Sequence, residues 1–257
     1  MADDTPLLEI EGIETCYGLS QVLFGMSLSI RSGEMVALMG RNGMGKTTTI
    51  RSIMGLTPAR AGTIRFGGQD VTHLPAWKRS RLGLARSFQI TSLLPNFTAA
   101  DNVALAAQAR DGHSFRFFGN ARQEKQLRAA AHAALDRVGL LGRADVVVSR
   151  LSHGEQRELE LAVALATKPQ LLLLDEPMAG LGVTESARMV KLLAELRQEV
   201  TIVLVEHDMN AVFVLADRIT VLVYGRVIAS DVPAAIRTNE EVKRAYLGDQ
   251  HVVTAHD

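Results

Sequence analysis

Short apolar segments alternate with longer amphipathic ones along this chain of 257 residues. Residues 7–18 and 21–30 alternate apolar and polar positions, as half-buried strands do. A continuous apolar run at 34–40 ends in glycine and is followed by a helical pattern, which predicts a strand, a glycine loop and a helix. Further strands are predicted at 63–71, 170–177, 201–208 and 218–225.

The order of these predicted segments indicates an α/β fold. Apolar strands interleaved with helices are typical of a mainly parallel sheet that helices cover on both faces. From about residue 98 the pattern turns alanine-rich and helical, and Thr98 with Asp101 forms a candidate capping box. We therefore expect an α/β core at 1–90 and 168–232, a helical subdomain at 91–167, and a C-terminal helix and tail at 233–257.

The composition is that of a soluble globular protein, with 47% hydrophobic and 22% charged residues. The 28 basic and 28 acidic residues cancel, which argues against a nucleic-acid-binding protein, since that class usually has a basic excess. The start, MADDTPLLEI, is not expected to be a secretory signal, and no apolar run approaches the roughly 20 residues that span a bilayer. The single cysteine, Cys16, excludes an internal disulfide and a cysteine-built metal site.

The segment GRNGMGKT, residues 40–47, fits the phosphate-binding pattern G-x-x-x-x-G-K-[ST]. Its glycines let backbone N–H groups turn toward phosphate oxygens, and the helix that begins at Lys46 adds the positive end of its dipole. We expect Lys46 to reach the β- and γ-phosphates and Thr47 to bind Mg²⁺. A chance glycine turn is disfavoured because a strand precedes the motif and a helix follows it. The candidate phosphate-binding residues are Gly40, Asn42, Gly43, Gly45, Lys46, Thr47 and Thr48.

A buried strand that ends in two carboxylates predicts the second part of a nucleotide site. In LLLLDE, residues 171–176, Asp175 is expected at the carboxyl edge of the sheet, where open α/β sheets bind ligands. Asp175 is a candidate Mg²⁺ ligand, through a water molecule, and Glu176 is a candidate base for the water that attacks the γ-phosphate. The alternative, a polar turn before Pro177, is disfavoured by the phosphate loop upstream.

A second glycine-containing helix start occurs at LSHGEQ, residues 151–156, where Ser152 and Glu155 have the spacing of a capping box. Taken alone, this stretch needs no role beyond starting a helix. Three further residues gain meaning only beside the two motifs above, because each alone is more commonly a surface, structural or half-buried residue. They are Tyr17, Gln89 and His207.

The phosphate loop, Gln89, LSHGEQ, LLLLDEP and His207 occur in the order and approximate spacing of the ATP-binding-cassette (ABC) ATPases, which the chain resembles over residues 17–224 at least. The resemblance implies ATP and Mg²⁺ as cofactors. It implies a P-loop NTPase of the ABC type, with a mainly parallel core, an N-terminal antiparallel β region and an inserted helical subdomain. It also implies a head-to-tail dimer in which ATP lies between the phosphate loop of one domain and the signature of the other, and LSHGEQ resembles that signature.

The resemblance assigns a role to each candidate. Tyr17 is similar to the aromatic residue that stacks on adenine, and Gln89 to the glutamine that contacts Mg²⁺ and the attacking water beside the transport domain. Glu176 is similar to the catalytic base, and His207 to the histidine that contacts the γ-phosphate. The signature residues expected at the partner's ATP are Ser152, Gly154 and Glu155.

The chain departs from the family pattern at two places. The signature differs from LSGGQ at His153 and Glu155, whereas Gly154 keeps the position at which the backbone approaches phosphate. Gly182 stands where many relatives carry an aspartate that acts across the dimer. Whether the two ATP sites of such a dimer communicate therefore stays an open question from the sequence.

A finer resemblance is to the ATP-binding subunits of branched-chain amino acid importers. It lies in LGLARSFQITSLLPNFTAADNVALAAQAR, in the loop after it at 111–119, whose role stays open, and in the C-terminal AYLG. It implies a peripheral subunit at the cytoplasmic face of the inner membrane that drives uptake of such amino acids or a related small solute. The implied partners are a second ABC ATPase, identical or different, two integral membrane permeases and, indirectly, a periplasmic or extracellular solute-binding protein, with no nucleic acid.

Three alternatives remain from the sequence. The ATPases of lipid or lipopolysaccharide exporters look similar. A non-transport cassette that works on ribosomes or DNA usually has two cassettes, a coiled-coil insert or basic arms, which this sequence lacks. A regulator that only binds nucleotide is disfavoured by Glu176 and His207. No residue identifies the solute, because other proteins recognise it.

Overall fold

The computed structural model describes residues 5–87, 93–110 and 121–247. They form two compact units, Met1–Arg79 with Thr201–Asp257, and Ser80–Val200. The predicted loop at 111–119 lies outside the described residues.

The first unit contains an antiparallel sheet with the strand order β2-β1-β4-β5. In it, β1 (Leu8–Tyr17) pairs with β2 (Ser20–Ile30) on one side and with β4 (Ala61–Phe66) on the other. A short strand, β5 (Gln69–Asp70), pairs with β4. Buried positions alternate with more exposed ones along most of β1 and β2, which confirms the predicted N-terminal antiparallel region.

The same unit contains strands in the order β10-β9-β3-β8. The strand β3 (Met35–Met39) lies parallel to both β8 (Thr201–Val205) and β9 (Arg218–Val223), and β10 (Arg226–Asp231) runs antiparallel to β9. Every residue of β3 and β8 is buried. Continuous burial is expected for parallel strands that are covered on both faces, as the apolar runs predicted.

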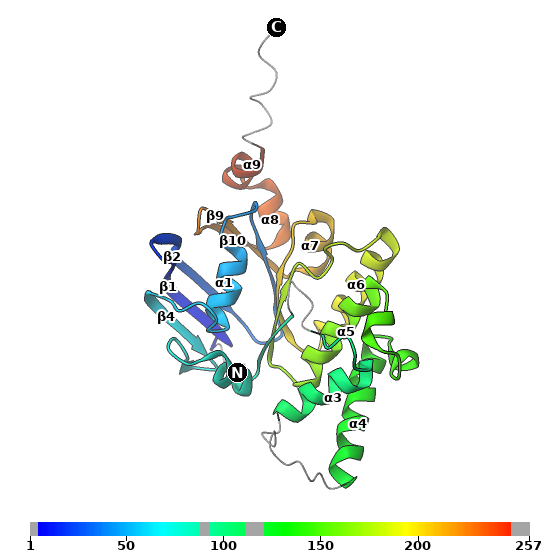
Figure 1. Cartoon of the computed structure of the whole chain (residues 1–257). Helices are drawn as coiled ribbons and strands as arrows, with labels where there is room; N and C mark the ends of the chain where they lie inside the picture. The colour runs from blue at the N-terminus through cyan, green and yellow to red at the C-terminus, as the bar shows by residue number, and fades with distance from the viewer. Residues whose placement is uncertain (1–4, 88–92, 111–120, 248–257) are drawn as a thin grey trace. The chain divides into compact units, whose positions relative to one another are not determined.

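Helices cover this sheet through a shared apolar core. α1 (Lys46–Ile53) follows β3, and α7 (Met209–Leu215) joins β8 to β9 along the chain. α8 (Pro233–Thr238) and α9 (Glu240–Leu247) follow β10 (Figure 1). One core cluster joins β3 and β9 to α7, α8 and α9, and its buried residues are Ala37, Met39, Val212, Ala216, Ile219, Val221, Ile236 and Val242.

Where one C-terminal helix was expected, the chain forms two. Asn239 between them has an extended backbone, with φ −67° and ψ 120°. Its side-chain oxygen accepts hydrogen bonds from the N–H groups of Glu241 and Val242, at 2.9 and 3.1 Å. Asn239 therefore ends α8 and caps the start of α9.

The second unit joins two parallel strands to helices. β6 (Leu84–Arg86) pairs with β7 (Leu171–Asp175). α3 (Ala99–Arg110), α4 (Ala121–Arg137) and α5 (His153–Ala166) pack against one another (Figure 1). The remaining helices are α6 (Val183–Leu196), the short 3₁₀ turns Leu141–Arg143 and Val148–Arg150, and α2 (Ala76–Leu82), which spans the division between the units.

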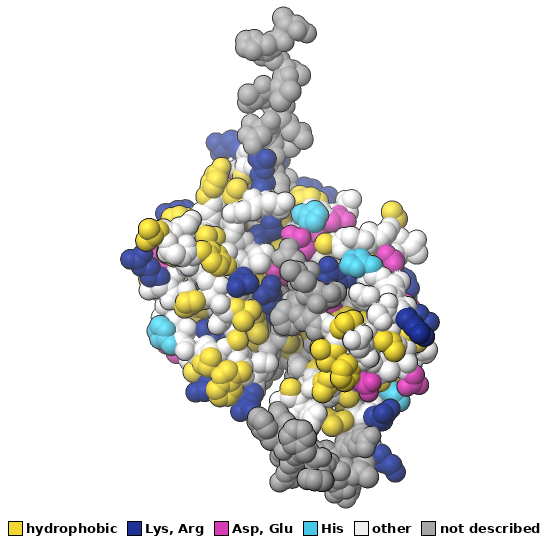
Figure 2. Space-filling model, viewed as in Figure 1, with side chains coloured by type: hydrophobic (Ala, Val, Ile, Leu, Met, Phe, Trp, Pro, Cys, Tyr) yellow, Lys and Arg dark blue, Asp and Glu magenta, His cyan; other side chains and the backbone are white. Residues whose placement is uncertain are grey.

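The start of α3 confirms the capping box predicted at Thr98 and Asp101. The Asp101 N–H donates to the Thr98 hydroxyl at 3.1 Å, and the Thr98 N–H donates to the Asp101 carboxylate at 3.3 Å. Within the described ranges, no helix is long and apolar enough to cross a membrane. On the face shown in Figure 2, Lys and Arg side chains lie scattered among hydrophobic and uncharged ones.

Candidate functional site

The predicted phosphate loop connects β3 to α1 in the first unit. Gly45, just before the helix, has a left-handed backbone with φ 101°, and a Cβ there would lie 2.8 Å from the Leu23 side chain. Only glycine suits this position, for both its φ and its lack of a side chain. No side chain caps α1, and its first turn has no acidic residue. The positive end of the helix dipole therefore faces the loop, as an anion site requires.

Lys46 lies within this loop and is only 5% exposed. Its Nζ donates to the carbonyl oxygens of Gly40, at 2.6 Å, and Arg41, at 3.1 Å. Thr47 is half-buried and Thr48 is buried. The structure thus gathers the predicted ammonium, the hydroxyls and the helix start in one segment.

Tyr17 ends β1, and its hydroxyl lies 3.5 Å from the hydroxyl of Thr57, which follows α1 in the chain. Burial by itself would raise the pKa of Tyr17. Hydrogen bonds with Thr57 and Thr48 and the charge of Arg51 outweigh burial, so the pKa is lower than the usual 10. The side chain remains 45% exposed, which leaves ring surface for stacking on a base.

His207 follows β8, and its side chain is 64% exposed. Its Nδ1 lies 3.8 Å from the carboxylate of Glu206, and its backbone N–H donates to the same carboxylate at 3.1 Å. Glu206 is almost fully buried. The sequence analysis did not select Glu206, although an acidic residue directly before a histidine at a strand end was a usable signal.

Asp175 ends β7 in the second unit and is buried. Its Oδ2 lies 3.0 Å from the guanidinium of Arg86, which ends the neighbouring strand β6 and has a buried side chain. The backbone N–H of Asp175 donates to the Ser87 hydroxyl at 3.4 Å. The sequence analysis missed Arg86, because the partner of Asp175 becomes visible only when β6 and β7 are paired. A carboxylate here and a hydroxyl at Thr47 are oxygen donors of the kind that Mg²⁺ prefers.

Glu176 has a left-handed backbone, with φ 53°, and a half-buried side chain. A residue other than glycine costs about 1–3 kcal/mol in this region, and such strain is concentrated at functional sites. Pro177 follows directly and disfavours the right-handed helical conformation for Glu176. Gln89, the other candidate near the attacking water, lies outside the described residues.

The signature stretch begins α5 through the predicted capping box. The Glu155 N–H donates to the Ser152 hydroxyl at 3.2 Å, and the Ser152 N–H donates to the Glu155 carboxylate at 2.8 Å. The bond from the Ser152 backbone is the main reason why the pKa of Glu155 is lowered, and Arg143, 2.9 Å away, acts in the same direction. Glu155 therefore stabilises its own helix start, and its contact with a partner's ATP stays a prediction.

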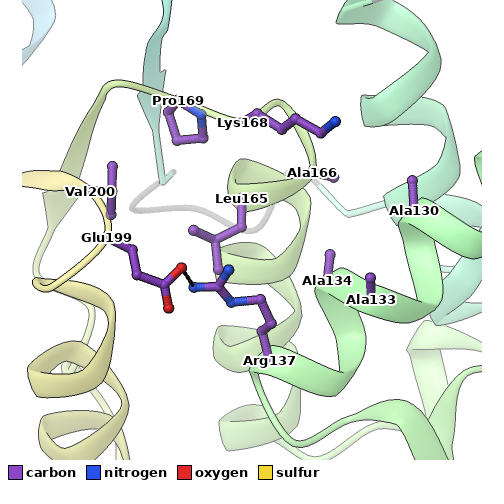
Figure 3. A pocket seen from close by; sticks show the side chains of 10 residues that line it. All are labelled: Ala130, Ala133, Ala134, Arg137, Leu165, Ala166, Lys168, Pro169, Glu199 and Val200. Atoms are coloured by element: carbon purple, nitrogen blue, oxygen red, sulfur yellow. Dashed lines mark ion pairs between the residues drawn. The ribbon is translucent and has the colours of Figure 1, made fainter.

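A cavity of about 440 Å³ in the second unit is formed by α4, the end of α5 and the turn after α6 (Figure 3). An ion pair between Arg137 and Glu199 lies within it. None of the predicted site residues lines this cavity. Its lining residues are Ala130, Ala133, Ala134, Arg137, Leu165, Ala166, Lys168, Pro169, Glu199 and Val200.

Comparison with known protein families gives two matches. The ABC transporter family matches residues 23–179, which is more than half of the chain. A second family, described as branched-chain amino acid ATP-binding cassette transporter, matches residues 226–252.

Similar individual proteins agree with this result. The chain is 37% identical over 252 residues to the high-affinity branched-chain amino acid transport ATP-binding protein LivG of Salmonella typhimurium, which covers 95% of this chain and 98% of LivG. The fold is that of MJ1267, an ATP-binding cassette of an ABC transporter, with a TM-score of 0.82 at 24% identity, over 95% of this chain and all of that one. A dimeric post-hydrolysis structure of the cassette MJ0796, bound to ADP and Pi, matches with a TM-score of 0.76 at 25% identity, over 88% of this chain and 98% of that one. Because the family match spans most of the chain and the likeness to LivG spans nearly all of it, this protein belongs to the ABC transporter family and is one of its ATPases.

Proposed function

We propose that this chain is the ATP-hydrolysing subunit of an importer, which couples hydrolysis of ATP to uptake of branched-chain amino acids or a related small solute. The observation that carries the proposal is the likeness to LivG along almost the whole chain. The separate match of residues 226–252 to the branched-chain amino acid cassette family supports it.

In this proposal, the phosphate loop binds the triphosphate of ATP. Lys46 exchanges its bonds with the Gly40 and Arg41 carbonyls for bonds to β- and γ-phosphate oxygens. Backbone N–H groups at the start of α1 bind the remaining phosphate oxygens, and Tyr17 stacks on the adenine. The loop residues that complete this contact set are Asn42, Gly43, Gly45 and Thr48.

Thr47, Asp175 and, through its amide, Gln89 are the residues that would hold Mg²⁺. When bound, Mg²⁺ supplies positive charge that offsets the charge on the phosphate oxygens. Arg86 orients the Asp175 carboxylate through its 3.0 Å contact.

Glu176 performs the proton transfer of the reaction. Its carboxylate accepts a proton from a water molecule that Gln89 orients, and the resulting hydroxide oxygen bonds to the γ-phosphorus as the bond to the ADP oxygen breaks. His207 donates a hydrogen bond to the γ-phosphate, and Glu206 orients the imidazole. The left-handed backbone of Glu176 fixes the direction in which its side chain projects from the main chain.

The proposed assembly has two ATPase subunits, with this chain paired either to itself or to a related chain. The dimeric MJ0796 structure supports the pairing. Ser152, Gly154 and Glu155 would then face the partner's ATP. Two membrane permeases dock on the pair at the cytoplasmic face of the membrane, and a solute-binding protein delivers the solute from the other side. Closure of the pair on ATP, and its opening after hydrolysis, would switch the permeases between access states.

The chemical part of the proposal is tested with Glu176→Gln, which keeps the size of the side chain and removes the base. We expect the ATPase rate to fall about 10²–10⁴-fold while the affinity for ATP stays within about threefold of wild type. Glu195→Gln is the control, because Glu195 is an exposed acidic residue of α6. An unchanged rate in Glu176→Gln would remove Glu176 from its assigned role.

The transport part is tested by isolating the tagged full-length protein in mild detergent from its native membranes and identifying the bound proteins by mass spectrometry. Two polytopic membrane proteins with a cassette ATPase support the importer. Recovery of soluble or ribosomal partners alone would contradict it and leave the ATPase intact.

A further inference from the structure

The signature residues 152–155, at the start of α5, contact the segment 180–185 at two points, and the first contact is made by Glu185. This residue lies in the first turn of α6, and its Oε2 accepts a hydrogen bond from the Gly182 N–H at 3.1 Å. Its Oε1 lies only 2.5 Å from the place that a Cβ of Gly154 would occupy. The carboxylate thus fills the space that the missing side chain of the signature glycine leaves open.

The second point of contact joins His153 to Gly180. A Cβ on Gly180 would lie 3.0 Å from the His153 Nε2, which is tighter than nine in ten real Cβ contacts. Gly180 has a left-handed backbone with φ 79°, so glycine is favoured there for two independent reasons. Adjacent residues of the signature, 153 and 154, therefore pack on the two ends of the segment 180–185.

A charge contact farther along the same helices adds to this connection. Arg188 of α6 lies 2.8 Å from the carboxylate of Glu158 in α5. Burial raises the pKa of Glu158, Arg188 opposes that shift, and the nearby carboxylates of Glu155 and Glu185 reinforce it. Arg188 thereby offsets the repulsion among three carboxylates and holds the first halves of α5 and α6 together.

We propose that Glu185, assisted by His153, is a positioning residue that makes the signature residues 152–155 and the segment 179–182 move as one body. This inference rests on the proposed function, in which the signature faces the nucleotide of a partner subunit. The chain has glycine at 182 in place of the aspartate of many relatives, and the carboxylate of Glu185 is bonded to the N–H of that same glycine. Glu185 thus supplies a carboxylate to the segment 179–182, and the same carboxylate packs on Gly154 of the signature.

The mechanical part of the proposal is tested by hydrogen exchange on the full-length protein without added nucleotide. In Glu185→Ala, amide exchange should rise about tenfold in peptides covering 151–157 and 179–183, because one charge-assisted hydrogen bond and its packing are lost. Glu195→Ala, on the same helix and exposed, should leave both peptides unchanged. Unchanged exchange at 151–157 in Glu185→Ala would overturn the connection, whatever the protein does.

A conservative variant separates positioning from general destabilisation. Glu185→Gln retains an oxygen that can accept from the Gly182 N–H, so both peptides should return to within about twofold of wild type. If Glu185→Gln exchanges as fast as Glu185→Ala although circular dichroism shows both folded, the hydrogen bond is not what joins the segments.

The functional part is tested by ATPase kinetics on the same proteins. Glu185→Ala should lower kcat at least about fivefold and leave the KM for ATP within twofold. The substitution leaves the phosphate loop unchanged and alters only the position of the signature at the partner subunit's ATP. Faster exchange with an unchanged kcat would overturn the positioning role. An inactive wild-type protein would instead count against the proposed function, and the exchange result would stand apart from it.

Discussion

The guanidinium of Arg86 lies 3.0 Å from the carboxylate of Asp175, and both side chains are almost completely buried. The two residues end neighbouring parallel strands, so the sheet itself sets their approach. Removing one member of a buried charge pair is strongly destabilising, because the other charge stays away from water. The carboxylate that we assign to Mg²⁺ is therefore also part of the stability of its own unit.

Replacing Arg86 by alanine should destabilise the protein by about 3–5 kcal/mol, because the buried Asp175 carboxylate loses the guanidinium 3.0 Å away. Added MgATP should recover part of the loss, since Mg²⁺ offers the carboxylate another cation. Urea unfolding with and without MgATP measures both effects. Arg65→Ala is the control, because its ion pairs with Glu9 and Glu11 are in large part solvent-accessible and their loss should be much smaller. Equal losses in the two variants would contradict the prediction.

Arg79→Lys should also destabilise the protein, by about 2–4 kcal/mol. The buried guanidinium donates to four carbonyl groups, and two of them, Ser52 and Ile53, belong to the C-terminal end of α1. Burial lowers the pKa of Arg79 to about 10, with Asp70 opposing the shift. Lysine has too few donors, in the wrong geometry, to satisfy these carbonyls.

Thermal unfolding followed by circular dichroism measures the effect. Arg81→Lys is matched to it in chemistry and helix, but Arg81 is exposed, so its melting temperature should stay close to wild type. A stable Arg79→Lys protein would show that the carbonyls at the end of α1 find other donors.

Glu34→Gln should have a lower free energy of unfolding than wild type at neutral pH and the same free energy of unfolding in acid. Arg218 binds the carboxylate through two nitrogens, at 2.7 and 3.1 Å. Burial by itself would raise the pKa of Glu34, but hydrogen bonds from Arg218 and Arg31 outweigh it and lower the pKa below the usual 4.5. The pair's contribution is thus complete above pH 4.5 and disappears as the pH falls through the lowered pKa.

Urea unfolding of both proteins at several pH values tests this prediction. At pH 7 the difference should be about 1–3 kcal/mol, as for a hydrogen-bonded charge pair that is partly buried. Glu240→Gln, whose partner Lys243 is exposed, serves as control and should show little change at any pH. A difference that grows toward acid pH would have the wrong sign.

Lys46→Ala should weaken ATP binding about 10–100-fold, the effect expected when a charged hydrogen-bond donor to phosphate is lost. Binding of a fluorescent ATP analogue to the purified protein measures it. Lys191→Ala removes an equal charge from the exposed surface of α6 and should leave the affinity unchanged. Equal affinities of Lys46→Ala and wild type would exclude the phosphate loop as the binding site.

Features that the sequence predicted correctly are those encoded within a few neighbouring residues. The strand, glycine loop and helix around Lys46 follow from one continuous stretch, and so do the capping boxes at Thr98 and Ser152. Each depends on backbone geometry that its own side chains determine. Family resemblance then suggested roles for residues whose local pattern was uninformative, such as Tyr17, and those roles stay predictions.

Features that the sequence did not reveal depend on contacts between distant segments. Arg86 and Asp175 are 89 positions apart, and Arg79 reaches back to the end of α1. Glu185 was missed because its importance lies in the space left by Gly154 on another helix. Neither the charge nor the periodicity of the sequence predicts these contacts, because the contacts depend on which strands pair and which helices pack.

The bonds from Lys46 to the carbonyls of Gly40 and Arg41 have a consequence for turnover. Because the ammonium already has acceptors in its own loop, binding of phosphate replaces these bonds and does not simply add new ones, so much of the gross attraction cancels. When ADP dissociates, the Lys46 ammonium can form its hydrogen bonds with the Gly40 and Arg41 carbonyls again. For a subunit that must release ADP in every cycle, such moderate and reversible binding favours turnover more than the highest possible affinity does.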